Sequence, residues 1–478
     1  MFCDISKAFD RVWHKGLIFK LKQYGLSENI LKWISSYLQY RKQRVFVNSE
    51  FSNEKHINAG VPQGSVLGPL LFLVYVNDIA DSLHSVTRLF ADDSSLAVTS
   101  NDNEYIQATL NHDLDIISKW ATQWLVQFNP SKTEVLYLSL MKNNARPSIV
   151  FQNTQLNFVV NHKHLGVTLS EDGSWHTHIT NIANSAAKVL GTMRMLKFKL
   201  RRRSLNQIYV SYLSPIMEYA SIVWENCTQY EKDLLDKIQY DAARIVTGLT
   251  RSVSINKLLN EIGWVSLKDR RQMQKLILMF KYSKGELPDY LNSHFPDLVI
   301  NTNNYFLRNQ MNYASIVRRL VIYSNSTIPS SVRMWNELDI DIRNSDTLST
   351  FKNKLKHIYK PADVPSFLLS GYRFYQVHHA RIRNNCSNLN ADLFTNHLRE
   401  SPECACGYAN EDAEHYFFRC SNFTNQRHQL FVMTRGFHPL SPHKLLYGIN
   451  TFGDEENKIL FTHVQSYIKA TKRFEPAS

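Results

Sequence analysis

The chain has 478 residues, of which 44% are hydrophobic, and it carries a formal net charge of +13 with a sequence pI of about 9.3. This length predicts roughly two to four domains, and the apolar content excludes disorder as the default state. The charge favours a polyanionic partner, with nucleic acid first and an acidic membrane surface second, although an ordinary basic enzyme would show the same balance. Six cysteines exclude a disulfide scaffold in so long a chain.

The first 172 residues mix short strands with helices. Residues 86–91 and 95–98 flank Asp92 and Asp93, which predicts a β-hairpin with two acidic residues at its tip. The other elements predicted here are helices over 17–39 (with a break near Gly25) and 105–126, and strands over 44–47, 135–140 and 158–169 (with Gly166 inside the last).

The later part of the chain is mainly helical. Residues 175–247 show a helical pattern throughout, and it continues to about residue 284. Residues 285–330 predict loops with short elements, 335–359 predict a further helix, and 361–365 read as a linker. The remaining residues predict a separate C-terminal unit.

Three aspartates are the candidate catalytic residues. Phosphoryl transfer with two cations about 3.5–4 Å apart needs carboxylates that converge from different strands. Asp92 and Asp93 at a hairpin tip supply two of them, and Asp4, at the end of an apolar N-terminal run, could supply the third. Each is also ordinary by itself, because Asp-Asp is common in turns and Asp4 is one of many acidic residues.

Three sequence blocks together are far more specific than any one aspartate. They are Asp4-Ile5-Ser6-Lys7-Ala8-Phe9-Asp10, then Gly60-Val61-Pro62-Gln63-Gly64-Ser65-Val66-Leu67-Gly68-Pro69, then Phe90-Ala91-Asp92-Asp93. In this order they resemble motifs A, B and C of reverse transcriptases. The spelling with Ala-Phe-Asp and Phe-Ala-Asp-Asp resembles non-LTR retrotransposons of the Jockey-like type. Asp10 has a plain surface interpretation and is left out of the catalytic set.

The resemblance implies roles for the residues of these motifs. Asp4, Asp92 and Asp93 would hold two Mg²⁺ ions, which activate the primer 3′-hydroxyl and neutralise the triphosphate. Phe9 would form the floor of the sugar pocket and exclude a ribose 2′-hydroxyl, although a core aromatic is the alternative. Gln63 and Gly64 would contact the incoming deoxynucleoside triphosphate and the template.

Two further segments resemble motifs D and E. Asn129-Pro130-Ser131-Lys132-Thr133 implies that Lys132 protonates the leaving pyrophosphate or stands beside it as a cation. An unremarkable surface lysine is the alternative. His164-Leu165-Gly166-Val167 resembles the primer-grip hairpin, in which Gly166 lets the backbone approach the primer strand.

A basic stretch lies where the family places its thumb. Residues 188–203 contain seven basic residues and no acidic one, so phosphate binding and a solvated charged face are the two interpretations. The residues predicted to bind nucleic acid are Lys197, Lys199, Arg201, Arg202 and Arg203.

Cysteine and histidine cluster near the C-terminus. Cys404, Cys406, His415 and Cys420 follow the spacing Cys-x-Cys-x8-His-x4-Cys, which predicts a structural Zn²⁺ site, with buried free thiols as the alternative. Related elements carry a similar Cys/Cys/His/Cys segment. His378, His379, Arg381 and Arg383 could add basic contacts, and Cys386 is a substitute ligand.

We therefore expect an α+β chain with a right-hand polymerase palm over 1–172, a helical thumb over 173–260, a helical connector over 261–364 and a small zinc-knuckle-like unit over 365–478. The expected activity is RNA-directed DNA polymerisation of a non-LTR retrotransposon, with an RNA template and a DNA primer as partners. No membrane association is expected, because residues 1–20 lack the apolar run of a signal peptide and the longest apolar run, 70–76, cannot span a bilayer. An intracellular, nuclear location follows, with a cytoplasmic ribonucleoprotein as the alternative.

The resemblance also places a fingers subdomain and an endonuclease ahead of Asp4. The sequence has three residues before Asp4, so we expect a truncated copy that polymerises weakly or not at all. A decayed or repurposed protein that only binds nucleic acid is the second hypothesis.

Overall fold

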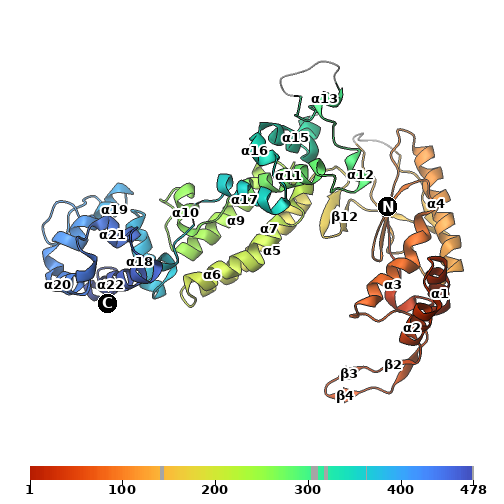
Figure 1. The fold of residues 1–478 in the computed structure, drawn as a ribbon, viewed down its shortest axis with the longest axis horizontal. Coiled ribbons are helices and arrows are strands. Elements are labelled where there is room, and N and C mark those ends of the chain that lie inside the picture. The colour runs from red at the N-terminus through yellow and green to blue at the C-terminus, as the bar shows by residue number, and fades with distance from the viewer. Residues whose placement is uncertain (140–144, 303–309, 317–320, 362, 476–478) are drawn as a thin grey trace. The chain divides into compact units, whose positions relative to one another are not determined.

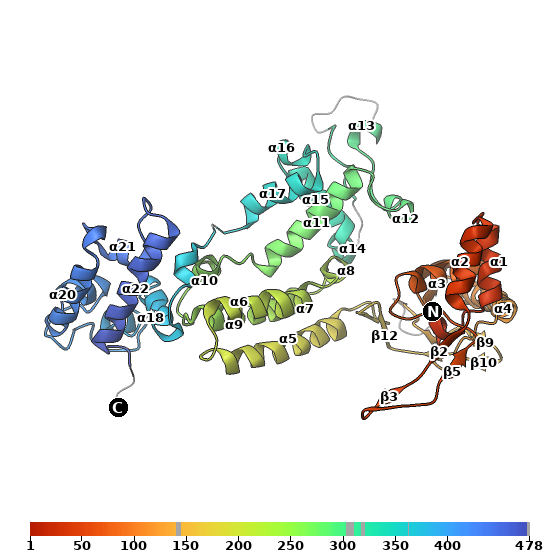
Figure 2. The ribbon, with the colours of Figure 1, turned by 60° about the horizontal axis from the view of Figure 1, so that its bottom comes forward.

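The structure is a computed structural model that describes residues 1–139, 145–302, 310–316, 321–361 and 363–475. It divides into two compact units, residues 1–177 and residues 178–478. The first unit combines small sheets with helices and the second is helical in the part described, so the predicted α+β content is confirmed (Figures 1 and 2). None of the described helices combines the length and the apolarity needed to cross a membrane.

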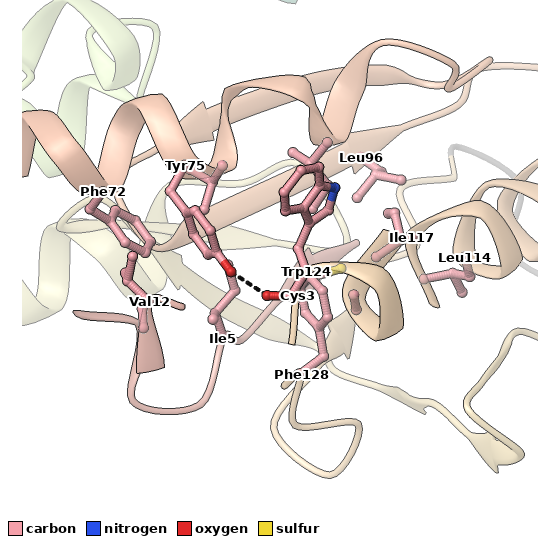
Figure 3. Packing of buried hydrophobic residues seen from close by; sticks show 14 of the residues in the cluster. Cys3, Ile5, Val12, Phe72, Tyr75, Leu96, Leu114, Ile117, Trp124 and Phe128 are labelled. Atoms are coloured by element: carbon pink, nitrogen blue, oxygen red, sulfur yellow. Dashed lines mark hydrogen bonds between the residues drawn. The ribbon is translucent and has the colours of Figure 1, made fainter. Parts of the chain in front are cut away.

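A five-stranded sheet forms the centre of the first unit, with strand order β11-β8-β1-β7-β6. Burial alternates along the first five residues: Cys3 and Ile5 face the core (Figure 3). Asp4 between them is only partly buried, as expected for a residue on the other face. The strands are β1 (Phe2–Cys3), β6 (Val86–Phe90), β7 (Asp93–Ala97), β8 (Glu134–Val135) and β11 (Asn157–Phe158).

Helices pack their apolar sides around this sheet to form one core. In that core the Tyr75 hydroxyl donates to the Trp124 carbonyl (Figure 3), and the Lys20 ammonium lies 3.8 Å from the centre of the Trp124 ring. The helical segments are η1 (Ala8–Arg11), α1 (His14–Gln23), α2 (Glu28–Leu38), α3 (Leu67–Val76), η2 (Asn77–Ala80) and α4 (Asn103–Gln123).

Four two-stranded ribbons complete the first unit. They pair β2 (Arg41–Gln43) with β5 (Lys55–Ile57), β3 (Phe46–Val47) with β4 (Glu50–Phe51), β9 (Val150–Phe151) with β10 (Thr154–Gln155), and β12 (Asn161–His164) with β13 (Val167–Ser170).

Most sequence predictions for the first unit are confirmed. The helix break falls at Gly25, whose φ is 81°, and the acidic hairpin forms between β6 and β7. The long strand predicted over 158–169 is wrong, because Leu165 and Gly166 both take positive φ and turn the chain into the hairpin of β12 and β13. The strand predicted over 135–140 is shorter, ending at Val135, and residue 140 lies outside the described residues.

The second unit contains the helices predicted from residue 175 onward. Its longest early helices are α5 (His176–Leu196) and α9 (Gln229–Thr247). Helix α9 begins with a capping box formed by Thr228 and Glu231, and Gly248 caps its C-terminal end. Residues 366–474 have a hydrophobic core of their own within this unit.

The helical bounds of the second unit are as follows: α5 (His176–Leu196), α6 (Arg202–Ile208), η3 (Tyr209–Leu213), α7 (Ser214–Glu218), α8 (Ser221–Trp224), α9 (Gln229–Thr247), α10 (Ile255–Ile262), α11 (Leu267–Ser283), α12 (Asp289–Asn292), α13 (Val299–Thr302), α14 (Val321–Ser324), α15 (Thr327–Glu337), α16 (Ile340–Arg343), α17 (Leu348–Tyr359), η4 (Ser366–Leu369), α18 (Arg373–Arg383), α19 (Asn390–Thr395), η5 (His415–Arg419), η6 (Ser421–Phe423), α20 (Thr424–Met433), η7 (Arg435–Phe437), α21 (Pro442–Tyr447) and α22 (Asp454–Thr471).

Candidate active site and metal centre

Asp4 and Asp93 stand at the same end of two paired strands of the central sheet. In the antiparallel pair of β1 and β7, Phe2 lies opposite Ser95 and Cys3 lies opposite Ser94. The next step of this register places Asp4 opposite Asp93, and both residues fall on the face away from the buried Cys3 and Ser94. Because Asp4 directly follows β1 and Asp93 begins β7, both aspartates stand at the same end of this strand pair.

Asp92 stands at the tip of the hairpin that Asp93 closes. Phe90 pairs with Asp93, which leaves Ala91 and Asp92 as the two turn residues, and Ala91 has a φ of 53°. Both aspartates of the tip are exposed. Among the described residues, the carboxylate oxygens of the three aspartates do not form a gathered ligand set.

The strand that carries Asp4 is short but central. The N-terminal ammonium donates to the Leu96 carbonyl over 2.9 Å, and Leu96 N–H donates back to the Met1 carbonyl over 3.0 Å. On the other side Asn129 N–H donates to the Asp4 carbonyl over 2.9 Å. Backbone hydrogen bonds therefore hold the N-terminal segment on one side at Met1 and on the other side at Asp4.

The loop of residues 60–68 is joined to the turn that follows Asp4. Gly60 N–H donates to the Val12 carbonyl and Val61 N–H donates to the Phe9 carbonyl, each over 2.8 Å. The Gln63 amide is exposed and donates to the Asp10 carboxylate over 2.9 Å. Asp10, which the sequence interpretation left out, thus orients the residue predicted to contact the nucleotide.

Phe9 and Gly64 occupy different surroundings beside this loop. The Phe9 ring is half-buried and stacks on Phe72 of α3, with ring centres 4.6 Å apart. This contact fits both interpretations of Phe9, the pocket floor and the core aromatic. Gly64 has a φ of 79°, which favours glycine, and it is exposed at the turn of the loop.

The segments that resemble motifs D and E flank the same sheet. Lys132 is exposed, and its N–H donates to the Asn129 carbonyl in the turn that also contacts Asp4. Gly166 lies at the tip of the hairpin of β12 and β13. In that hairpin His164 lies close enough to Asp93 for the carboxylate to act on its pKa, which burial nevertheless lowers below the usual value.

Phe2 links the hairpin to the central strand. Its ring stacks on His162 at 3.7 Å between centres and lies 4.9 Å from His164. The aspartates and the hairpin are therefore held together in one unit. Sequence reasoning included His164 in the hairpin motif but missed its contact with Phe2, and it missed His162, although the His-Lys-His pattern before Leu165 was visible.

The basic stretch of the second unit divides into exposed and buried residues. Lys197, Lys199, Arg201 and Arg203 are exposed. The prediction that Arg202 binds nucleic acid is corrected, because its side chain is fully buried and its guanidinium bonds the Glu261 carboxylate over 2.9 Å. Arg383 binds the same carboxylate. Burial by itself would raise the pKa of Glu261, but the two guanidinium groups outweigh it and lower the pKa to about 2.

The four predicted zinc ligands do come together. One ligand atom from each of Cys404, Cys406, His415 and Cys420 lies within 4.8 Å of the other three. The sulfur atoms of Cys404 and Cys420 are 3.8 Å apart, and His415 Nε2 is 3.4 Å from the Cys406 sulfur. Two sulfurs bound tetrahedrally at about 2.3 Å from zinc would be about 3.8 Å apart. The arrangement therefore fits Zn²⁺, and burial lowers the pKa of His415, which favours the neutral imidazole that a metal needs.

The residues before this cluster have structural partners instead. His378, His379 and Arg383 are buried, and Arg381 donates to the Gly248 carbonyl over 2.8 Å. The suggestion that they add nucleic-acid contacts is therefore wrong for the three buried residues. Cys386 is buried outside the group of four, so the suggestion that it substitutes as a ligand is not supported.

The sequence of this chain was compared with those of known proteins. Residues 1–192 match the family described as reverse transcriptase (RNA-dependent DNA polymerase). This part of the chain is therefore similar in sequence to reverse transcriptases. The match contains the three aspartates, the glycine-rich loop and both hairpins of the candidate active site, which confirms the family that the motifs predicted.

The individual relatives of this chain come from mobile elements. The chain is 30% identical over 319 residues to the probable RNA-directed DNA polymerase from transposon X-element of Drosophila melanogaster, covering 63% of this chain and 35% of the relative. It is 30% identical over 282 residues to the RNA-directed DNA polymerase from mobile element jockey of Drosophila funebris, covering 55% and 30%. The predicted Jockey-like resemblance is thereby confirmed.

A more distant relative extends the likeness along the chain. The putative 115 kDa protein in type-1 retrotransposable element R1DM of Drosophila melanogaster is 23% identical over 449 residues, which cover 89% of this chain and 40% of the relative. The chain thus spans between 30% and 40% of the length of these three relatives.

Proposed function

We propose that this chain is an RNA-directed DNA polymerase that adds deoxynucleotides to a primer 3′-hydroxyl on an RNA template. The observation that carries the proposal is the register of β1 against β7, which sets Asp4 beside Asp93 at the hairpin that also bears Asp92. In this proposal residues 1–172 serve as the palm, 173–260 as the thumb, 261–364 as a connector and 365–478 as a zinc-binding unit. The proposed location of the polymerase activity is the nucleus.

Each motif residue has a task in this proposal. Asp4, Asp92 and Asp93 hold two Mg²⁺ ions, which when bound supply charge neutralisation at the attacking and leaving oxygens. Gln63, held by Asp10, orients the incoming nucleotide, and Phe9 limits the space beside its sugar. Lys132 stands at the turn next to Asp4 as the proton donor or cation for pyrophosphate.

The hairpin of β12 and β13 serves in this proposal as the grip on the primer. Leu165 and Gly166 form its two-residue turn, and the glycine leaves the backbone open to close approach. The contact of His162 and His164 with Phe2 supports this role, because it ties the grip to the strand that carries Asp4.

Primer extension tests the proposal directly. The full chain is incubated with Mg²⁺, a poly(rA) template, an oligo(dT) primer and dTTP. Any extension by the parent chain, which we expect to be weak, should fall at least about a hundredfold in Asp92→Asn and Asp93→Asn, as when a central electrostatic group is removed. Asp102→Asn, at the N-cap of α4, is the control that should leave extension unchanged.

The outcomes separate two functions. Extension that survives both substitutions would overturn the proposed active site. Binding of template and primer without any extension would instead support the second function, a nucleic-acid-binding protein without polymerase activity. The exposed basic residues of the second unit are the observation that favours that alternative.

A further inference from the structure

A turn between α5 and α6 presents an unusual mixture of side chains. Residues 195–203, which we call the basic turn, carry the exposed cations Lys197, Lys199, Arg201 and Arg203. None of these four forms an ion pair with any residue that the structure describes. Phe198 lies among them with 74% of its surface exposed, and the Lys197 ammonium is 4.7 Å from the centre of its ring.

The backbone of the basic turn is held from a distant part of the sequence. The buried Arg373 guanidinium donates through Nε to the Lys197 carbonyl over 3.1 Å. Its other two nitrogens donate to the carbonyls of Val246 and Ile245 over 2.7 Å and 2.6 Å, at the C-terminal end of α9. The three bonds of one planar fork thus fix the turn against a helix end, where a cation is favoured.

The neighbouring contacts make this junction rigid. Arg381, on the same helix α18, donates to the Gly248 carbonyl just beyond α9, and Val377 packs where a Cβ on Gly248 would lie. Arg383, also on α18, shares the buried Glu261 carboxylate with Arg202, the residue that follows the exposed Arg201. Both flanks of the basic turn are therefore anchored by α18, which precedes the cysteine and histidine cluster in the chain.

We propose that the basic turn binds an unpaired stretch of nucleic acid, with Phe198 stacking on a base, and that Arg373 is a positioning residue that holds the turn in its binding conformation. The inference rests on the proposed function only in taking nucleic acid as the ligand. It adds a stacking residue, and it gives the C-terminal part of the chain a role in shaping the surface.

The chemistry of the turn favours unpaired nucleotides over a duplex. An exposed ring offers a face on which a free base can stack, and such stacking contributes about 1–3 kcal/mol for each base. A duplex offers its phosphates to lysine and arginine but keeps its bases stacked on each other. Cations that form no ion pair among the described residues, one of them against an exposed aromatic ring, match a single strand, whose phosphates and bases are both exposed.

Binding measurements on the full chain test this inference. Fluorescence anisotropy is recorded with a labelled 12-nucleotide mixed-sequence RNA and with the blunt RNA–DNA hybrid of the same sequence. Phe198→Ala should weaken binding of the single strand by about 5- to 150-fold, the range that corresponds to one lost base stack. Binding of the hybrid should change less than twofold. Tyr230→Ala is the matched control, because Tyr230 is also 74% exposed and lies on α9 of the same unit.

Arg373 needs a measurement that simple destabilisation would not reproduce. Arg373→Lys keeps a cation but cannot reach three carbonyls at once. If Arg373 acts through the turn, the double variant with Phe198→Ala should bind the single strand no more weakly than Phe198→Ala alone. Additive losses, or a loss that merely follows a lower melting temperature, would overturn the positioning role.

Other outcomes decide against the stacking surface itself. The stacking surface would be overturned if Phe198→Ala lost affinity equally for the single strand and the hybrid, or lost none at all. It would also be overturned if Phe198→Ala kept its affinity for RNA but lost affinity for vesicles of phosphatidylcholine and phosphatidylserine. These readouts do not require polymerisation. A chain that fails to extend a primer yet shows the Phe198 discrimination would refute the proposed function and leave this inference standing.

Discussion

At the scale of single residues, Asp10 holds the side chain of Gln63, a contact that its neighbours in sequence did not suggest. Asp10 follows Phe9 in an exposed 3₁₀ turn, where an acidic residue needs no special explanation. Its carboxylate nevertheless accepts a hydrogen bond from Gln63, which lies 53 positions away. A contact over that distance depends on the fold, so no local pattern could have shown it.

Substitution of Asp10 tests this orienting contact. Asp10→Ala removes the acceptor and frees the Gln63 amide to rotate. A hydrogen bond to an exposed charged group contributes about 1 kcal/mol, so we expect the KM for the deoxynucleoside triphosphate to rise about fivefold while kcat changes little. Steady-state primer extension measures both constants. Asp115→Ala on α4 is the control, and an unaltered KM in Asp10→Ala would contradict the contact.

At the scale of elements, the sequence predicted best where local chemistry decides the structure. The Asp-Asp turn between two apolar runs and the break at Gly25 depend on local turn preferences. The strand β1 has two residues and gains its place from pairing with β7 and β8, which local pattern cannot show. Arg202 likewise looked like its exposed neighbours, and only tertiary packing places it on Glu261.

The loop that enters α3 gives an element-scale prediction from two of its glycines. A Cβ on Gly68 would lie 2.3 Å from the Pro62 carbonyl oxygen, whereas a Cβ on Gly64 would meet nothing within 4 Å. Gly68→Ala should therefore displace the loop backbone and lower both stability and extension severely. Gly64→Ala should cost only the strain of a positive φ, about 1–2 kcal/mol. Thermal unfolding and extension of both variants check this order, and equal losses would contradict it.

At the scale of the whole molecule, the metal centre should stabilise the second unit. Cys420 and His415 adjoin Tyr416 and Phe417, which are fully buried in the C-terminal core. A structural zinc contributes directly to folding, so chelation should lower the melting temperature and release one zinc per chain. Cys406→Ser should lose the zinc, and Cys386→Ser, outside the ligand set, should retain it. Mass spectrometry measures the zinc content of each variant. Equal zinc contents in Cys406→Ser and Cys386→Ser would contradict the assignment of the four ligands.

Two buried histidines of α18 make the stability of the second unit depend on pH. Burial, with Arg383 as the next cause, lowers the pKa of His379 to about 3, and burial with Arg381 lowers that of His378 to about 4. The His379 Nε2–H donates to the Leu445 carbonyl over 2.9 Å, and the His378 ring stacks on Phe474. Both residues are therefore held neutral in the folded chain.

The sign of the effect follows from proton binding. Between the unfolded pKa of 6.5 and the lowered values, the unfolded chain binds protons that the folded chain does not, so stability falls as pH falls. One pH unit in this window costs up to about 1.4 kcal/mol for each histidine. The two neutral histidines therefore cost the fold no stability above pH 6.5. Below that pH the free energy of unfolding falls progressively.

Replacing one histidine should remove its share of this dependence. His379→Gln can still donate to the Leu445 carbonyl but does not titrate, so its melting temperature should fall less between pH 7 and pH 5 than that of the parent chain. Contributions from the zinc ligands are common to both proteins and cancel in the comparison. His428→Gln, an exposed position on α20, should leave the parent pH dependence unchanged. A His379→Gln chain that loses as much stability as the parent would show that His379 is not held neutral by the fold.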